Sequence, residues 1–278
     1  MSFKIVVDSC CELPEPYKSA PNTEFVPLGI SVGDYHIMDD ETFDQAEFLQ
    51  KVREYEGCPK SSCPSPDRYM RAFDCEYDDV YVVTLSSHLS GSYNSALLGK
   101  NLYHEEKGAK NIHIFDSESA SGGEAQVAMT AWKYASEGLP FEEVIQKTEE
   151  FRDNQKTYFI LDSLEALRKN GRMSNVKAMV ATTLNIKPVM GGVHGIIELR
   201  GQAIGMKKAF VKMIEIMMKE ATDPENRHLV ITHCNCPERA HVVRDMILKK
   251  IPFKDSLIMD TNGISSLYAS DGGIIVTC

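Results

Sequence analysis

Apolar, β-branched segments of strand length alternate with amphipathic segments of helix length along the first half of this 278-residue chain, and this alternation restricts the fold strongly. The expected strands are Lys4–Val7, Phe25–Leu28, Val80–Leu85 and Asn111–Asp116. The expected helices are Thr42–Glu54, Ser95–Glu106, Gly123–Glu137 and Phe141–Asp153. Gly29–His36 interrupts them as a short antiparallel excursion. Strands that alternate with helices predict a mainly parallel sheet with flanking helices, so we expect an α/β fold.

The pattern becomes more mixed after about residue 155. Lys187–Met190 and Gly195–Leu199 predict a hairpin that turns at Gly191-Gly192. The other expected elements of this half are strands Thr157–Asp162, Leu229–Thr232, Ser256–Asp260 and Gly273–Thr277, and helices Leu164–Lys169, Ala178–Leu184, Met206–Glu220 and Glu238–Lys249. We therefore expect two domains, an α/β domain over residues 1–155 and a smaller mixed α/β domain over residues 156–278.

The charge balance limits the partners that the chain can have. It carries 40 Asp and Glu residues against 30 Lys and Arg residues, a formal net charge of -10, which argues against binding nucleic acid. The N-terminal segment MSFKIVVDSCCELP does not have the pattern of a signal peptide, and no segment approaches the ~20 apolar residues of a membrane span. We expect a cytoplasmic protein with reduced cysteines.

Two cysteine clusters are candidate metal ligands. Cys58 and Cys63 lie five residues apart, and Cys234 and Cys236 lie next to His233. A closed zinc site needs four ligands, usually from two paired hooks, and neither spacing matches that arrangement. We therefore expect no metal, and we interpret these cysteines as small buried thiols and a turn at the end of a strand.

The serine-rich segment after Val80–Leu85 is the strongest candidate for a binding site. Ser86, Ser90 and Ser92 lie between this strand and the helix that follows it. In open parallel sheets, ligands bind beyond the carboxyl ends of strands, where a helix N-terminus offers free N–H groups. Serine hydroxyls beside these groups suit a carboxylate or a phosphate. The same residues are also typical of an ordinary capped turn.

Three other polar segments favour the interpretation as a site. Asp8-Ser9 follows the first strand, Ser61–Pro66 forms a serine- and proline-rich loop, and Asp116–Gly123 follows the strand Asn111–Phe115. Each is ordinary turn chemistry by itself. Loops that follow several elements of one sheet converge on the same edge, so together they favour a site there.

A serine hydrolase is the competing class. Ser90, His88 and Asp116 provide the three residue types of a catalytic triad, but the nucleophile elbow G-x-S-x-G is absent, and His88 lies in the same loop as Ser90. A nucleotide-binding kinase is disfavoured because neither of the glycine-rich phosphate-binding motifs occurs.

Seven segments, in order along the chain, resemble the DegV family of bacterial fatty-acid-binding proteins. They are Asp8-Ser9 with Leu13-Pro14, Ser61–Pro66 with Tyr69, LSSHLSGSYNSA at residues 85–96, Asp116–Gly123, Leu167–Ser174, Asn185–Met190 and Ser265–Gly273. The resemblance implies a two-domain α/β protein that holds one long-chain fatty acid between its domains, without a cofactor. It also implies a carrier that presents the carboxylate to a separate ATP-dependent fatty acid kinase, which forms an acyl phosphate.

The resemblance further implies roles for individual residues. Ser61 and Ser90 are expected to bind the carboxylate, with Ser62 and Ser92 as close candidates. Many relatives have a histidine before a Gly-Pro-Gly turn near the ligand head group; this chain has Tyr268 in that region, and we expect its hydroxyl there. The expected pocket residues are Met179, Leu184, Ile186 and Met190. Arg172 and Arg200 are expected near the pocket mouth as the docking face for the kinase, although Arg172 also suits a solvated turn.

Overall fold

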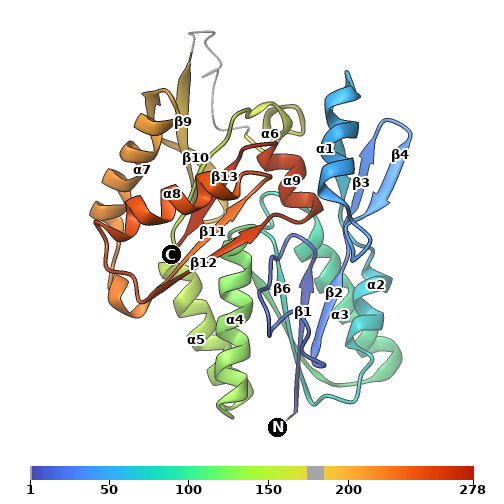
Figure 1. The fold of residues 1–278 in the computed structure, drawn as a ribbon. Helices are drawn as coiled ribbons and strands as arrows, with labels where there is room; N and C mark the ends of the chain where they lie inside the picture. Colours follow the sequence, from blue (N-terminus) through green and yellow to red (C-terminus); the bar gives the residue numbers. More distant parts are fainter. Residues whose placement is uncertain (1, 174–184) are drawn as a thin grey trace.

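The computed structural model describes residues 2–173 and 185–278 (Figure 1). The predicted helix Ala178–Leu184 lies outside these residues. Within them, no helix combines the length and the apolar character that crossing a membrane requires.

A parallel four-stranded sheet forms the N-terminal part, in the order β2-β1-β6-β7. Its strands are β1 (Phe3–Asp8), β2 (Thr23–Val26), β6 (Asp79–Thr84) and β7 (Asn111–Asp116). Every residue of β6 is buried, as is typical of a central strand that is covered on both faces. The prediction of a mainly parallel sheet is confirmed.

Helices cover both faces of this sheet because successive side chains of its strands point to opposite sides. Ile5 and Val7 pack with α4 (Gly122–Ser136) and α5 (Phe141–Asn154) on one face. Val6 packs on the other face with α2 (Pro66–Phe73) and α3 (Ser92–Lys107).

A small antiparallel sheet, in the order β4-β3-β5, stands beside the parallel one. Its members are β3 (Gly29–Val32), β4 (Tyr35–Met38) and β5 (Lys60–Ser62), and α1 (Gln45–Glu54) accompanies them (Figure 1). The antiparallel excursion was predicted, but β5 was not: Ser61 and Ser62, which were expected in a loop, pair with β3.

A mixed six-stranded sheet contains the C-terminal strands, in the order β10-β9-β8-β13-β11-β12. These are β8 (Thr157–Ile160), β9 (Ile186–Val193), β10 (Ile196–Ile204), β11 (His228–His233), β12 (Asp255–Asp260) and β13 (Ile274–Thr277). The helical segments of this part are α6 (Glu165–Lys169), α7 (Met206–Glu220), a 3₁₀ turn (Pro224–Asn226), α8 (Pro237–Leu248) and α9 (Gly263–Ala269). Met213, Ile214 and Met217 of α7, a helix that the sequence predicted, lie in the apolar core of this part.

The β9–β10 hairpin turns later than expected. Gly191 and Gly192 lie inside β9 and pair with Tyr158 and Thr157 of β8. A Cβ atom on Gly191 would come within 3.0 Å of the Thr157 carbonyl oxygen, so this glycine permits a close approach of two strands. The turn is His194-Gly195, where φ is 46° and 76°, the positive values that a two-residue hairpin turn favours.

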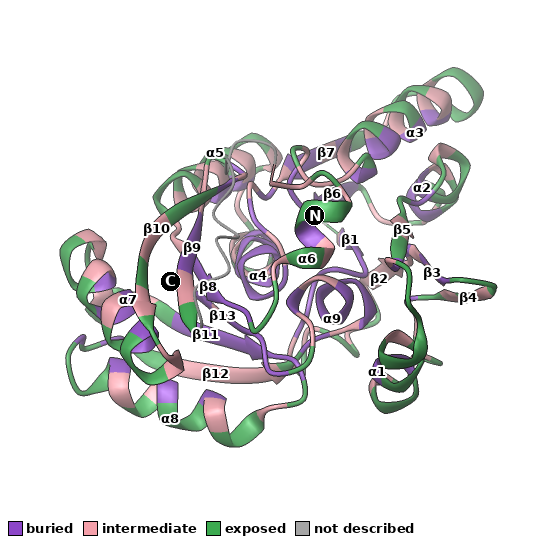
Figure 2. Cartoon of the chain, turned by 90° about the horizontal axis from the view of Figure 1, so that it is seen from above, coloured by how far each residue is buried: buried purple, intermediate pink, exposed green. Residues whose placement is uncertain are grey.

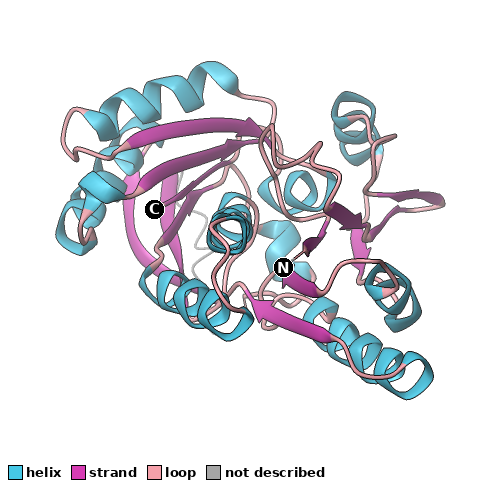
Figure 3. Cartoon of the chain, turned by 90° about the horizontal axis from the view of Figure 1, so that it is seen from below, coloured by secondary structure: helices cyan, strands magenta, loops and turns pink. Residues whose placement is uncertain are grey.

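Helix α4 lies between the two large sheets, which Figure 3 shows apart from each other. A Cβ atom on Gly122 would lie 2.7 Å from Val230 Cγ1, and Gln126 donates a hydrogen bond of 2.8 Å to the His228 carbonyl oxygen. A shared apolar cluster also joins the two parts, with Leu28 and Leu85 from one and Phe159 from the other. In Figure 2 the buried strands β8, β11 and β13 face this region. The division near residue 155 stays a prediction.

Candidate ligand-binding site

The loops of the parallel sheet and the inner strands of the mixed sheet enclose a cavity. Its empty volume is about 820 Å³, part of which is open to solvent. The loop after β1 contributes Cys10, the segment after β6 contributes Leu85 and Ser90, and the loop after β7 contributes residues 118–121. Three of the predicted polar loops therefore do converge. Ser61–Pro66 reaches the cavity by another route, through strand β5 of the small antiparallel sheet.

Most of the cavity wall is apolar. Leucine, isoleucine and phenylalanine side chains from both halves of the chain form it, namely Leu28, Leu85, Phe159, Leu161, Ile264 and Ile275. Sequence reasoning missed the residues of the second half. Their signal is the alternation of Thr157, Phe159 and Leu161 along and just beyond β8, because every second residue of a strand faces the same side.

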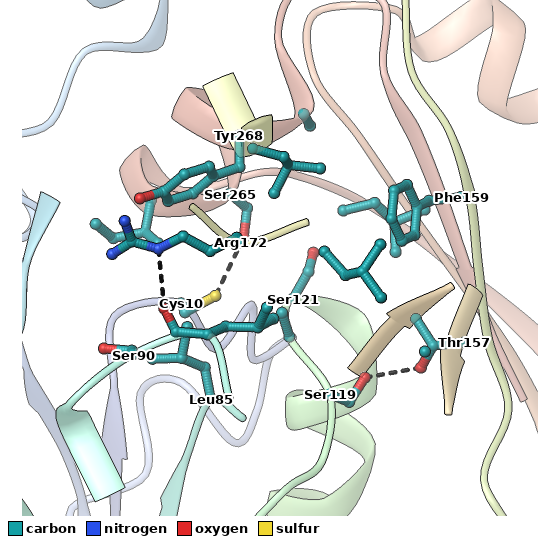
Figure 4. A pocket seen from close by; sticks show the side chains of 18 of the residues that line it. Cys10, Leu85, Ser90, Ser119, Ser121, Thr157, Phe159, Arg172, Ser265 and Tyr268 are labelled. Carbon is teal, nitrogen blue, oxygen red and sulfur yellow. Dashed lines mark hydrogen bonds between the residues drawn. The ribbon is translucent and has the colours of Figure 1, made fainter. Parts of the chain in front are cut away.

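One end of the cavity is polar. The Ser61 and Tyr268 hydroxyls are 2.7 Å apart, and Ser90 lines the same cavity. The Arg172 guanidinium lies over the Tyr268 ring, 5.6 Å from its centre, and donates a 3.1 Å hydrogen bond from Nε to the Leu89 carbonyl oxygen. Figure 4 shows Ser90, Arg172 and Tyr268 close together, opposite Thr157 and Phe159. We call the end formed by the hydroxyls of Ser61, Ser90 and Tyr268 the hydroxyl end; Arg172 lies beside it.

Two of the expected carboxylate ligands do not line the cavity. Ser92 is fully buried. Its hydroxyl donates a hydrogen bond of 2.6 Å to Asp8 Oδ2 and shares one of 2.5 Å with the Tyr69 hydroxyl, so Ser92 belongs to the core below the site. Ser62 follows Ser61 in strand β5 and therefore points to the opposite side, toward Gly29.

The expected pocket residues of β9 lie outside the cavity wall. Met190 is fully buried in the shared apolar cluster without lining the cavity. Ile186 is 37% exposed at the start of β9, where it pairs with Ile204 at the open edge of the mixed sheet. Met179 and Leu184 lie outside the described residues.

The structure separates Arg172 from Arg200, which were expected together at the mouth. Arg172 is half-buried in the cavity wall. Arg200 forms an ion pair with Glu220 and lines a second, polar pocket. That pocket adjoins the cavity near Thr157, at the far side from the hydroxyl end.

The three residue types of a hydrolase do not form a catalytic triad. Asp116 accepts hydrogen bonds from the backbone N–H groups of Ser87 and Glu118, and the Ser90 hydroxyl accepts one from the Ser92 N–H. Across residues 2–173 and 185–278, no hydrogen bond joins His88 to Ser90 or to Asp116. His88 is exposed and lines a depression outside the cavity.

Buried carboxyl groups hold the elements around the cavity. Asp8 accepts hydrogen bonds from the Leu85 and Cys10 N–H groups, both at 3.0 Å, and burial raises its pKa to about 6. At the N-terminus of α9, Asp39 accepts from the Gly263 and Ile264 N–H groups at 2.7 and 2.9 Å. Burial raises the pKa of Asp39 to about 6 as well.

Glu12 holds the same end of α9, where its Oε1 accepts a hydrogen bond of 2.9 Å from the Asn262 N–H. Burial raises the pKa of Glu12 to about 8. Because α9 carries Ser265 and Tyr268 into the cavity wall, Asp39 and Glu12 together position these two side chains.

No metal site accompanies the cavity in the part of the chain that the structure describes: no three His, Cys, Asp or Glu side chains are placed to hold an ion. All eight cysteines are free thiols, and four of them are buried.

An α/β fold that encloses an apolar cavity with neutral hydroxyls at one end defines a protein that binds a small amphiphilic molecule. The family model described as "Uncharacterised protein, DegV family" matches residues 2–277. The chain belongs to the DegV family.

Relatives cover the whole chain. A DegV-family protein from Ruminococcus gnavus, whose crystal structure contains vaccenic acid, has 47% identity and a TM-score of 0.98, with 100% of both chains covered. The fatty acid kinase B3 protein of Streptococcus pneumoniae, loaded with linoleic acid, has 34% identity and a TM-score of 0.90, with 100% of this chain and 99% of that one covered. A DegV domain-containing protein of Streptococcus gordonii is 34% identical, over 99% of this chain and 98% of its own.

Proposed function

We propose that the chain binds one long-chain fatty acid in this cavity, with the tail along the apolar wall and the carboxylate at the hydroxyl end. The observation that carries the proposal is the polarity of the cavity, whose wall is largely apolar and ends at Ser61, Ser90 and Tyr268. The fatty acids in the Ruminococcus gnavus and Streptococcus pneumoniae proteins support it.

The tail supplies most of the affinity. Burying about 14 methylene groups at ~0.8 kcal/mol each contributes at most ~11 kcal/mol before the cost of ordering the ligand. A few hydrogen bonds to the carboxylate contribute less, at about 0.5–3 kcal/mol each. The hydroxyl end therefore mainly orients the ligand, and Arg172 beside it offsets the carboxylate charge.

The oriented carboxylate suits transfer to a second protein. Neutral hydroxyls can hold a carboxylate while one oxygen stays free to attack a phosphoryl donor, whereas a bidentate arginine would occupy both oxygens. The kinship with the pneumococcal fatty acid kinase B3 protein supports a partner of this kind. We infer that the chain is a cytoplasmic carrier without a cofactor. It presents the acid to a separate ATP-dependent fatty acid kinase for acyl-phosphate formation. Its candidate docking residues are Arg172, beside the hydroxyl end, and Arg200, on the far side of the cavity.

Native mass spectrometry of the protein purified from a bacterial host tests the binding. We expect a retained mass in the fatty-acid range, and its replacement by octadecanoic acid when that acid is added in excess. A protein that carries no such mass and does not bind octadecanoic acid would contradict the proposal. Hydrolysis of a p-nitrophenyl ester above background, lost in both His88→Ala and Ser90→Ala, would favour the hydrolase instead.

A further inference from the structure

The cavity and the polar pocket that contains Arg200 share a wall. Glu118, Thr157 and Gly192 line both of them, and we call these three residues the dividing wall. Figure 4 shows Thr157 on the side of the cavity opposite Arg172 and Tyr268. The tail of a fatty acid whose carboxylate lies at the hydroxyl end would therefore extend toward the dividing wall.

Gly192 stands in the middle of a row of residues that crosses three strands. It pairs with Thr157 of β8 and with Ile197 of β10, and both of these partners line the cavity. Residues directly opposite each other on antiparallel strands carry their side chains on the same face of the sheet. A side chain at position 192 would therefore point into the cavity between Thr157 and Ile197.

The absence of a side chain at Gly192 leaves space at this end of the cavity. A Cβ atom there would lie 3.5 Å from Thr157 Cβ and 3.9 Å from the Glu118 carbonyl oxygen, which are ordinary contacts. Gly191 differs, because its Cβ would lie 3.0 Å from the Thr157 carbonyl oxygen. Gly192 also lacks the positive φ that favours glycine, so neither packing nor backbone requires a glycine there.

The surroundings change from apolar to charged across the dividing wall. Arg152, Lys156 and the ion pair of Arg200 with Glu220 line the polar pocket behind it. A methylene group gains binding free energy when it leaves water for an apolar wall, but not when it lies among hydrated charges. The affinity for a fatty acid should therefore rise with chain length until the tail reaches the wall, and then level off.

The dividing wall suits the methyl end of a tail. The Thr157 hydroxyl already shares a hydrogen bond of 2.8 Å with the Ser119 hydroxyl, so it needs none from the ligand. Resting on the proposed function, we propose that Gly192 determines the length of the acyl chain that the cavity accepts. The methyl end of an unbranched long-chain acid lies in the space beside Gly192, and any further carbon atoms enter the polar pocket.

The test measures how the affinity depends on chain length, by displacement of a fluorescent fatty acid with saturated acids from dodecanoic to docosanoic acid. We expect the affinity of the parent protein to level off at one chain length, and to level off at a shorter length in Gly192→Ala and Gly192→Val. The acid at which the parent levels off should bind Gly192→Val about tenfold or more weakly, as for an overpacked site. The shortest acids, which do not reach residue 192, should bind both proteins within about twofold.

Gly201→Ala provides the control. Gly201 lies in β10 on the other face of the same sheet, where an added Cβ atom would contact Lys212 and Ile216 of α7 at 3.4 Å. This variant should keep the length profile of the parent. Gly192→Ala adds only the Cβ atom, so it keeps the test decisive if valine at this position prevents folding.

Two results would overturn the inference: a folded Gly192 variant that keeps the parent's length profile, or one that binds every acid more weakly by the same factor. Either would show that the tail does not end beside Gly192. If no acid binds the parent protein, the proposed function fails as well. If the acids bind and residue 192 does not affect the profile, only this inference fails.

Discussion

The Ser61 and Tyr268 hydroxyls form one hydrogen bond at the end of the cavity that Ser90 also lines. We expect Ser61→Ala with Ser90→Ala to weaken octadecanoic acid binding by ~1–3 kcal/mol through lost hydrogen bonds, about 5- to 150-fold in the dissociation constant. Ser62→Ala is the matched control. The Ser62 side chain points away from the cavity, so this variant should bind octadecanoic acid with the affinity of the parent. Titration calorimetry measures both. Equal affinity in the folded double variant and the parent would remove Ser61 and Ser90 from the site.

At the scale of residues, the sequence located the serine-rich segments but could not always choose among their hydroxyls. Ser61 and Ser62 are chemically identical neighbours, and only the strand that contains them decides which one faces the cavity. Ser90 and Ser92 differ because the buried Asp8 captures the Ser92 hydroxyl. This hydrogen bond joins residues 84 positions apart, so no local sequence pattern could predict it.

At the scale of elements, two buried carboxyl groups, those of Glu12 and Asp39, hold helix α9 by accepting hydrogen bonds from backbone N–H groups at its N-terminus. The folded state raises the pKa of Glu12 from 4.5 to about 8, so it binds a proton more tightly than the unfolded state does. The stability that this provides is complete below about pH 4.5 and is lost as the pH rises through about 8. Asp8 and Asp39 act in the same direction, between their usual 3.8 and about 6.

We therefore expect the melting temperature to fall as the pH rises from about 5 to about 8, and Glu12→Gln to reduce this slope, because an amide keeps the acceptor for the Asn262 N–H without a charge. Calorimetry at several pH values measures the slope. Glu41→Gln, at an exposed carboxyl, should leave it as in the parent. A melting temperature that rises over this range, or a slope that Glu12→Gln does not alter, would contradict the prediction.

Periodicity predicted the long elements well, and it failed where elements are short or uniformly buried. Strand β5 has three residues and no apolar alternation, so it resembled a loop. Helix α2 was not predicted either, although the sequence contains a signal for its start: Ser65 caps the helix and Pro66 stands in its first turn. In α9 every residue except Tyr268 is buried, so it has no polar face from which a helical period can be read.

At the scale of the whole molecule, the ligand should stabilise both parts of the chain at once, because the cavity wall combines loops that adjoin the strands of the parallel sheet with strand residues of the mixed sheet. At a free concentration 100 times its dissociation constant, octadecanoic acid should add ~2.7 kcal/mol to the free energy of unfolding. We expect scanning calorimetry to show one transition that moves to higher temperature as a unit. Two transitions, of which the acid moves only one, would show that the two parts unfold separately and that one of them binds alone.

The apolar cluster that joins the two parts, which includes Leu28, Leu85, Phe159 and Ile264, should also affect how fast a bound fatty acid exchanges. If the acyl chain leaves only when the walls from the two parts of the chain separate, the protein and not the competing lipid sets the exchange rate. Exchange followed by stopped-flow fluorescence should then reach a rate that no longer depends on the concentration of the incoming acid. The residence time of the lipid would then be set by how often the cavity opens. A partner that speeds delivery would do so by separating the two parts of the chain.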